Sequence, residues 1–222
     1  MKKITLPSLL VCALTIGIAM PASAQLSLPG LGGGSKSSGG DIDSQVKSFT
    51  EKSSAINGLV YKSLKFIVAA YASTEEAAKI AEETKAFEAI TDPKEKQAKV
   101  AEALKSDSAK LEEISKSKDA QEKTKKLDKT KQAQVAASVG NFLIAALRAP
   151  DLVKNGQTIV QSVSSNPMNV GKVVSVKDAI PILSDAISTS TKVMPGFMKV
   201  LQGANVQVPK VTAESKTEEV KF

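Results

Sequence analysis

The sequence predicts an all-α protein that folds as a single-domain antiparallel bundle of about six to eight helices. From Asp41 onward, apolar residues recur every three or four positions, which is the spacing of one helix face. Helix-start signals punctuate the same region, and alternation of apolar and polar residues is confined to a short stretch after Gly203. We expect longer helices first and short, proline-delimited helices in the C-terminal third.

Residues 1–24 have the pattern of a bacterial secretory signal peptide. Lys2 and Lys3 precede an apolar stretch that is shorter than the ~20 residues a membrane-spanning helix needs. Ala22-Ser23-Ala24 forms a small-residue cleavage site, so we expect cleavage after Ala24. The rest of the chain is therefore predicted to be periplasmic or secreted.

The composition excludes several kinds of chemistry. The sequence contains no histidine, and its one cysteine, Cys12, lies in the predicted leader. Most zinc sites and many nucleophile–base pairs use these two residue types. Two Ser-x-x-Lys spacings, at Ser44–Lys47 and Ser115–Lys118, lack the partner motifs of the enzymes that use such a pair. We therefore expect no catalytic residues, no metal site and no cofactor.

The charge of the chain comes almost entirely from lysine. The formal net charge is +7, and all 30 basic residues except Arg148 are lysine. Aromatic residues make up only 4% of the chain. Nucleic-acid-binding proteins favour arginine for base contacts and aromatic side chains for stacking, so no nucleic-acid partner is expected. The charge fits either a solvated lysine-rich surface or a weak attraction to anionic envelope surfaces.

Composition also divides the chain into segments. Residues 25–40 are rich in glycine and serine and predict a flexible linker. Residues 41–208 contain the helical pattern and form the predicted bundle domain. Residues 209–222 carry many charges and predict a frayed C-terminal tail.

Local signals place the first three helices. Apolar residues recur along residues 42–71 and predict one long helix. Ser73, followed three residues later by Glu76, has the spacing of a capping box and predicts the start of a second helix. Asp92, followed by a proline and then by Glu95, predicts the start of a third helix in the same way.

The remaining helices are predicted from charge and proline positions. A charged, alanine-rich helix is expected to break near Ser115–Lys118, and residues 119–148 are expected to form the next helix. Within it, the uncharged run Gln132–Leu147 is too short to cross a membrane and predicts a core helix. Four prolines are expected to divide the rest: Pro150, Pro167, Pro181 and Pro195. The last three of these and Pro209 are each 14 residues apart, which is either chance or a degenerate repeat.

Two stretches are candidates for contact with a ligand or partner. Leu59–Val68 combines a broad apolar surface with lysines, so it either lies on a lipid surface or forms a core helix. Val193–Met198 is apolar and contains two methionines, which either adapt to a partner or fill the core. The candidate contacts, including one aromatic residue from the predicted core helix, are Met194, Phe197, Met198, Phe142, Tyr61 and Phe66.

These observations predict an exported, non-catalytic envelope protein that binds a protein, a peptide or a cell-wall polymer. The alternative is a lipid or amphiphile carrier, in which residues 135–147 and 179–201 line a cavity. A carrier requires a continuous apolar cavity, whereas a binding module requires a filled core and an exposed groove or patch. An enzyme requires a cleft in which a partly desolvated carboxylate, or a serine with a lysine, converges.

Overall fold

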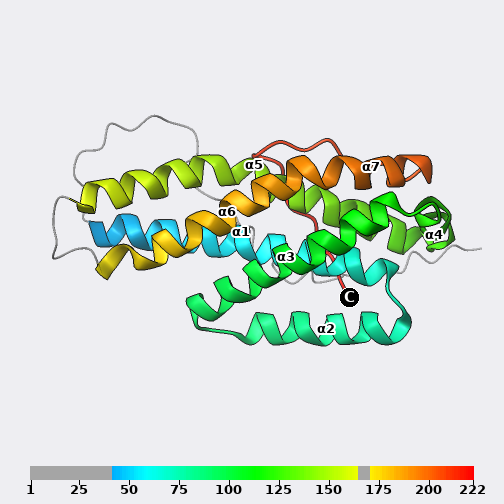
Figure 1. The fold of residues 1–222 in the computed structure, drawn as a ribbon, viewed down its shortest axis with the longest axis horizontal. Helices are drawn as coiled ribbons and strands as arrows, with labels where there is room; N and C mark the ends of the chain where they lie inside the picture. The colour runs from blue at the N-terminus through cyan, green and yellow to red at the C-terminus, as the bar shows by residue number, and fades with distance from the viewer. Residues whose placement is uncertain (1–41, 165–170) are drawn as a thin grey trace, which may run out of the picture. The chain divides into compact units, whose positions relative to one another are not determined.

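The computed structural model describes residues 42–164 and 171–222 (Figure 1). Helices fill most of these residues, which contain no strand, so the predicted all-α bundle is confirmed. The predicted signal peptide, the linker and Pro167 lie outside the described residues. The helices are α1 (Ile42–Tyr71), α2 (Thr74–Ala89), α3 (Pro93–Lys116), α4 (Ala120–Lys126), α5 (Lys129–Ser164), α6 (Val174–Lys192) and α7 (Met194–Gly203).

Helix α1 is the central element of the bundle. It packs against α2, α3, α5 and α6 (Figure 1). Val60, Leu64 and Ile67 are completely buried, and Phe66 and Val68 are nearly so. A helix that is apolar over most of its circumference belongs inside a core. Leu59–Val68 is therefore part of a core helix.

The other helices surround α1 unequally. Helices α5 and α6 pack against α1 and against each other, and α3 packs against α1, α6 and α7. Helix α2 makes its extensive helix contacts with α1, and it runs beside α3 without being packed along it (Figure 1). One face of α2 is thus held by the bundle, and two surface hollows lie between α2 and α3.

The predicted starts of α2 and α3 agree with the structure. The Glu76 backbone N–H donates to Ser73 Oγ (3.3 Å), and the Ser73 N–H donates to Glu76 Oε2 (3.1 Å), which completes the capping box. At α3, Asp92 Oδ1 accepts from the Lys94 N–H (2.8 Å). The Glu95 side chain does not close a second box there but lines a surface hollow.

The region 119–148 does not form the single helix that was predicted. Helix α4 ends at Lys126, and α5 starts at Lys129. The Gln132 amide donates to the carbonyls of Thr124 (3.0 Å) and Leu127 (3.1 Å), and Asp128 Oδ1 accepts from the Lys131 N–H (2.7 Å). These side chains satisfy the backbone groups that a helix break leaves free.

The prolines delimit the C-terminal helices less than predicted. Pro195 lies in the first turn of α7, but Pro150 lies inside α5 and Pro181 lies inside α6. Both interior prolines are exposed, whereas their neighbours Ala149 and Ile182 are buried in the core. Core packing on the opposite side therefore holds the helix through each proline, which overrides its local tendency to break a helix.

The C-terminal segment is also more ordered than predicted. Residues 209–222, expected to fray, lie along α5 and reach α1 (Figure 1). The Arg148 Nε–H donates to the Ala213 carbonyl (2.7 Å), and the Phe222 ring contacts the Phe66 ring. Tertiary contacts that a local composition does not reveal thus hold this charged segment in place.

Gly156 lies where α5 packs closely against Phe49 and Ile180, and it provides a test of this packing. A Cβ atom at Gly156 would lie 2.7 Å from Phe49 Cε2 and 3.2 Å from Ile180 Cδ1. Because the Phe49 ring is buried, Gly156→Ala is expected to lower the free energy of unfolding by about 1–3 kcal/mol. Urea unfolding followed by circular dichroism measures the change.

Gly58 is the matched control for this substitution. It lies inside α1, and a Cβ atom added there would meet nothing within 4 Å beyond its chain neighbours and the backbone of its own helix. Gly58→Ala is expected to raise the free energy of unfolding by about 0.5–1 kcal/mol, because alanine loses less backbone entropy in a helix. Equal unfolding midpoints for Gly156→Ala and the unchanged protein would contradict the proposed close packing.

Candidate functional site

Two hollows lie between α2 and α3, with α1 beneath them. The first has a volume of about 320 Å³ and the second about 340 Å³, and both are lined by Glu83. We call the two together the α2–α3 groove. Its floor comes from α1, and its two sides come from α2 and α3: the main lining residues are Tyr61, Lys65, Tyr71, Ile80, Glu83, Phe87, Lys99, Glu102, Lys110 and Ile114.

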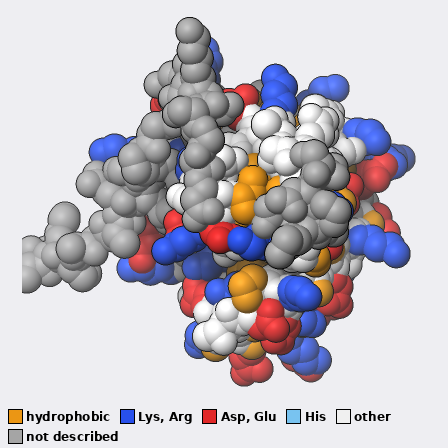
Figure 2. Space-filling view, turned by 90° about the vertical axis from the view of Figure 1, so that its left-hand side faces the viewer, with side chains coloured by type: hydrophobic (Ala, Val, Ile, Leu, Met, Phe, Trp, Pro, Cys, Tyr) orange, Lys and Arg blue, Asp and Glu red, His pale blue; other side chains and the backbone are white. Residues whose placement is uncertain are grey.

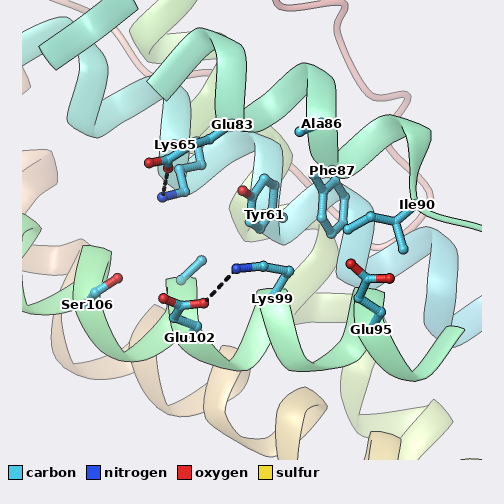
Figure 3. A pocket seen from close by; sticks show the side chains of 11 residues that line it. Tyr61, Lys65, Glu83, Ala86, Phe87, Ile90, Glu95, Lys99, Glu102 and Ser106 are labelled. Atoms are coloured by element: carbon cyan, nitrogen blue, oxygen red, sulfur yellow. Dashed lines mark hydrogen bonds and ion pairs between the residues drawn. The ribbon is translucent and has the colours of Figure 1, made fainter. Parts of the chain in front are cut away.

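A pair of stacked rings forms the floor of the first hollow. The Tyr61 and Phe87 ring centroids lie 3.9 Å apart, with an angle of 13° between the ring planes. Figure 3 shows the two rings side by side between α2 and α3. Both side chains are largely buried, and burial raises the pKa of the Tyr61 hydroxyl. The hydroxyl therefore stays protonated at neutral pH.

Lys65 connects the three helices of the groove. Its Nζ lies 2.9 Å from Glu83 Oε2 on α2 and 3.4 Å from Asp107 Oδ2 on α3. The Asp107 side chain is only 1% exposed, and Ser106 Oγ donates to its other oxygen (3.3 Å). Lys65 thus supplies the positive charge that compensates a buried carboxylate.

The charge state of Lys65 follows from these neighbours. Burial alone lowers the pKa of Lys65, but its hydrogen bond to Glu83 and the negative charges of Asp107 and Glu83 outweigh burial and raise the pKa. A lysine in this state remains a cation over the physiological range. Lys65 is therefore a fixed positive charge at the base of the groove.

The rims of the groove carry charges of both signs. Lys99 Nζ lies 3.2 Å from Glu102 Oε2 along α3, as the dashed line in Figure 3 shows. Glu95 also lines the first hollow, and it makes no ion pair with any described residue. Three glutamates and two lysines line the first hollow, so this part of a basic protein is locally acidic.

A small polar cavity adjoins the first hollow on the other side of Phe87. It has a volume of about 50 Å³ and is lined by residues that include Asn57 and Gln97. Asn57 is 4% exposed, and neither its side-chain nitrogen nor its oxygen has a hydrogen-bond partner among the described residues. An unsatisfied buried amide destabilises a fold by about 1–3 kcal/mol, so Asn57 is a polar side chain that the local packing leaves without compensation.

The structure separates the six residues that the sequence suggested as contacts. Phe142, Met194 and Phe197 are completely buried in the core, and Met198 is partly buried against it. Phe66 is buried beneath Phe222. Of the six, Tyr61 alone lines the α2–α3 groove.

Sequence reasoning missed Phe87, Lys65 and Asp107 as a group. They come from three different helices, and no local spacing relates them. One signal was present: Asp107 falls at a position that the helical period of α3 places on the same face as Leu104 and Leu111. A carboxylate in an apolar stripe indicates a buried partner of opposite charge.

Neither a membrane span nor a metal site emerges from the described residues. Lys129–Val163 is long and apolar enough to cross a membrane, but 72% of its most apolar window is buried in the bundle, as in a core helix. No group of three or more acidic side chains in residues 42–164 and 171–222 is arranged to hold a metal ion.

Comparisons with known proteins give no further guidance. No protein-family model, no curated protein and no solved structure matches this chain. The function is therefore argued from the geometry of the groove.

The Lys65–Asp107 pair is testable by thermodynamics. Lys65→Met is expected to lower the free energy of unfolding by about 3–5 kcal/mol, because it leaves the Asp107 carboxylate buried without its ion-pair partner. Adding Asp107→Asn removes the uncompensated charge, so the double variant is expected to be more stable than Lys65→Met alone. Urea unfolding of the four proteins in this cycle measures the coupling.

The pH dependence of the same proteins gives a second check. Because the pKa of Lys65 is raised above 10.5 in the folded state, its stabilisation is fully present below pH 10.5 and is lost as the pH rises through the folded-state pKa. The stability difference between the unchanged protein and Lys65→Met should therefore shrink above that pH.

In the variant cycle, a double variant less stable than Lys65→Met would refute the assigned role of the pair.

Proposed function

We propose that this protein is an exported, non-catalytic envelope protein that binds a peptide segment of a partner protein in the α2–α3 groove. The observation that carries the proposal is an open groove with a buried aromatic floor and charges of both signs on its rims. Such a combination of apolar contact and flanking polar groups is typical of binding sites. Export rests on the predicted signal peptide.

The filled core supports a binding module over a carrier. The alternative hypothesis requires a cavity between the apolar helices of the C-terminal half. Phe142, Met194 and Phe197 instead have no exposed surface, and they belong to one continuous cluster of buried apolar side chains. The hollows described above lie against α1, α2 and α3, and none of these three residues lines them.

The chemistry of the cluster at Lys65 supports binding over catalysis. A cleft with a desolvated carboxylate is present, since Asp107 lies beneath the first hollow. However, Lys65 covers that carboxylate and is itself held in its charged form. An acid–base catalyst requires a group that exchanges a proton near neutral pH, whereas the raised pKa of Lys65 keeps this amine protonated there.

The charges of the groove indicate the chemistry of the partner segment. A lipid tail requires a uniformly apolar lining, whereas the groove has glutamates and lysines on both sides. The excess of carboxylates in the first hollow favours a segment with lysine or arginine beside apolar side chains. On the face of the molecule that Figure 2 shows, lysines are mixed with acidic side chains, and the visible hydrophobic patches of the described residues are small and separate.

Site-specific photo-crosslinking in growing cells tests this proposal. Glu95→p-benzoylphenylalanine places a photoreactive group at the first hollow, and we expect it to form a defined crosslink to a protein partner. Ala86 lines the same hollow and is exposed, so Ala86→Trp is expected to fill it and reduce the crosslink about tenfold or more. Immunoblotting and mass spectrometry of the crosslinked species measure the yield and identify the partner.

The controls use positions outside the groove. Ala78 is also exposed on α2 but lines neither hollow, so Ala78→Trp should leave the crosslink unchanged. A photoreactive residue at Asp178 on α6 should not capture the same partner. Equal crosslinking from Asp178, or no effect of Ala86→Trp, would contradict the proposal, and crosslinks to glycan alone would favour a cell-wall polymer.

A further inference from the structure

The C-terminal segment occupies a defined site on the bundle. We call residues Pro209–Phe222 the strap and the surface beneath it the strap site. The strap site consists of Gly140, Asn141 and Arg148 on α5, together with Phe66 on α1. Asn141 and Arg148 are seven residues apart, so two helical turns bring them to the same face of α5.

The hydrogen bonds of the strap site recognise main chain. Arg148 donates from Nε to the Ala213 carbonyl (2.7 Å) and from Nη2 to the Ser215 carbonyl (2.9 Å). The Asn141 side chain donates to the Glu218 carbonyl (2.8 Å) and accepts from the Glu218 N–H (2.9 Å). All four bonds join an α5 side chain to the strap backbone. The site therefore binds the backbone of an extended chain, and these four hydrogen bonds do not involve the charged side chains of the strap.

Apolar contacts hold the two ends of the strap. Pro209 lies directly over Gly140, where a Cβ atom would come within 3.1 Å of Pro209 Cγ. At the other end, the rings of Phe222 and Phe66 meet edge to face with their centroids 5.2 Å apart. The strap site thus has two contact points for apolar residues. One is the backbone at Gly140, which Pro209 contacts, and the other is the Phe66 ring, which Phe222 contacts.

The strap is held less firmly than the helices beneath it. Its charged side chains are exposed, Val211 and Val220 are only partly buried, and Phe222 is 49% exposed. Segments that bury little apolar area open at a lower free energy than the core does. Release of the strap is therefore expected to leave the bundle folded.

The connection to α7 allows the strap to move as a unit. Helix α7 ends in a turn in which Asn205 has a left-handed φ of 59° and the Val206 N–H donates to the Leu201 carbonyl (2.9 Å). This is the hydrogen-bond pattern of a helix C-cap, and asparagine tolerates its backbone conformation. Gln207 and Val208 follow that turn and connect it to the strap; Gln207 is exposed, and Val208 is partly buried against the core.

We propose that the strap site is an exchangeable docking site and that its second occupant is the strap of another copy of this protein. The strap of a second copy has the same sequence, so it can make every contact described above. The exchanged dimer and the single chain therefore contain the same contacts between strap and strap site. Reciprocal exchange buries both straps and closes a two-fold dimer. A short tether gives the chain's own strap an effective concentration of about 1 mM, so exchange is expected as the protein approaches that concentration.

The single arginine provides a direct reporter of this exchange. In full-length protein labelled with ¹⁵N-arginine, the Nε–H of Arg148 gives one side-chain resonance. A second, unlabelled population carries Cys12→Ser and Thr217→Cys, with a nitroxide spin label on the new cysteine of the strap. When the two are mixed at about 0.5 mM each, exchange places nitroxides beside labelled Arg148 and reduces its signal by up to about twofold. Chemical reduction of the nitroxide should restore the signal.

Two controls make the outcome decisive. A spin label at Asp178→Cys on α6 reports random encounters between copies and should leave the Arg148 signal unchanged. Asn141→Ala in the ¹⁵N-labelled population removes half of these hydrogen bonds from the single chain and from the exchanged dimer alike, so it should speed the onset of the signal loss and leave its final extent unchanged. No loss from the strap label, or an equal loss from the Asp178→Cys label, would overturn the proposal.

Discussion

The structure depends on the burial of α1 against four other helices. The second half of α1 is apolar over most of its circumference, and α2, α3, α5 and α6 together cover the helix. Helices α5 and α6 pack against α1 and against each other and build a filled core on one side. On the other side, α2 and α3 each rest on α1, and the space between them remains a groove whose floor is the α1 surface itself.

Lys65 and its two carboxylate partners link the three helices that form the groove. The lysine joins α1 to Glu83 on α2 and to Asp107 on α3, so it fixes both sides of the groove with one side chain. An apolar residue at this position would let the two helices close over it, as packed helices do when their facing side chains are apolar. The charged cluster instead keeps polar groups at the base of an otherwise aromatic floor, which suits a partner with both apolar and charged side chains.

The sequence predicts those features that depend on neighbouring residues. The starts of α2 and α3 follow from Ser73 and Asp92, since a cap is a local hydrogen bond. The break between α4 and α5 was missed because Gln132 reaches back to carbonyls eight and five residues earlier. The docked strap was missed because its partners on α5 are more than 60 residues away in the chain. Most of the groove was missed for the same reason, since three helices contribute to it and Tyr61 was the one residue anticipated.

Amide hydrogen exchange tests most directly the proposal that a partner segment binds in the α2–α3 groove. The full-length protein is measured alone and again with the isolated, detergent-free envelope fraction of its own cells. The account predicts slower exchange in α2 and in the part of α3 that lines the groove, because a bound segment suppresses the opening of these helices. Slower exchange confined to α6 and α7, with α2 and α3 unchanged, would contradict it.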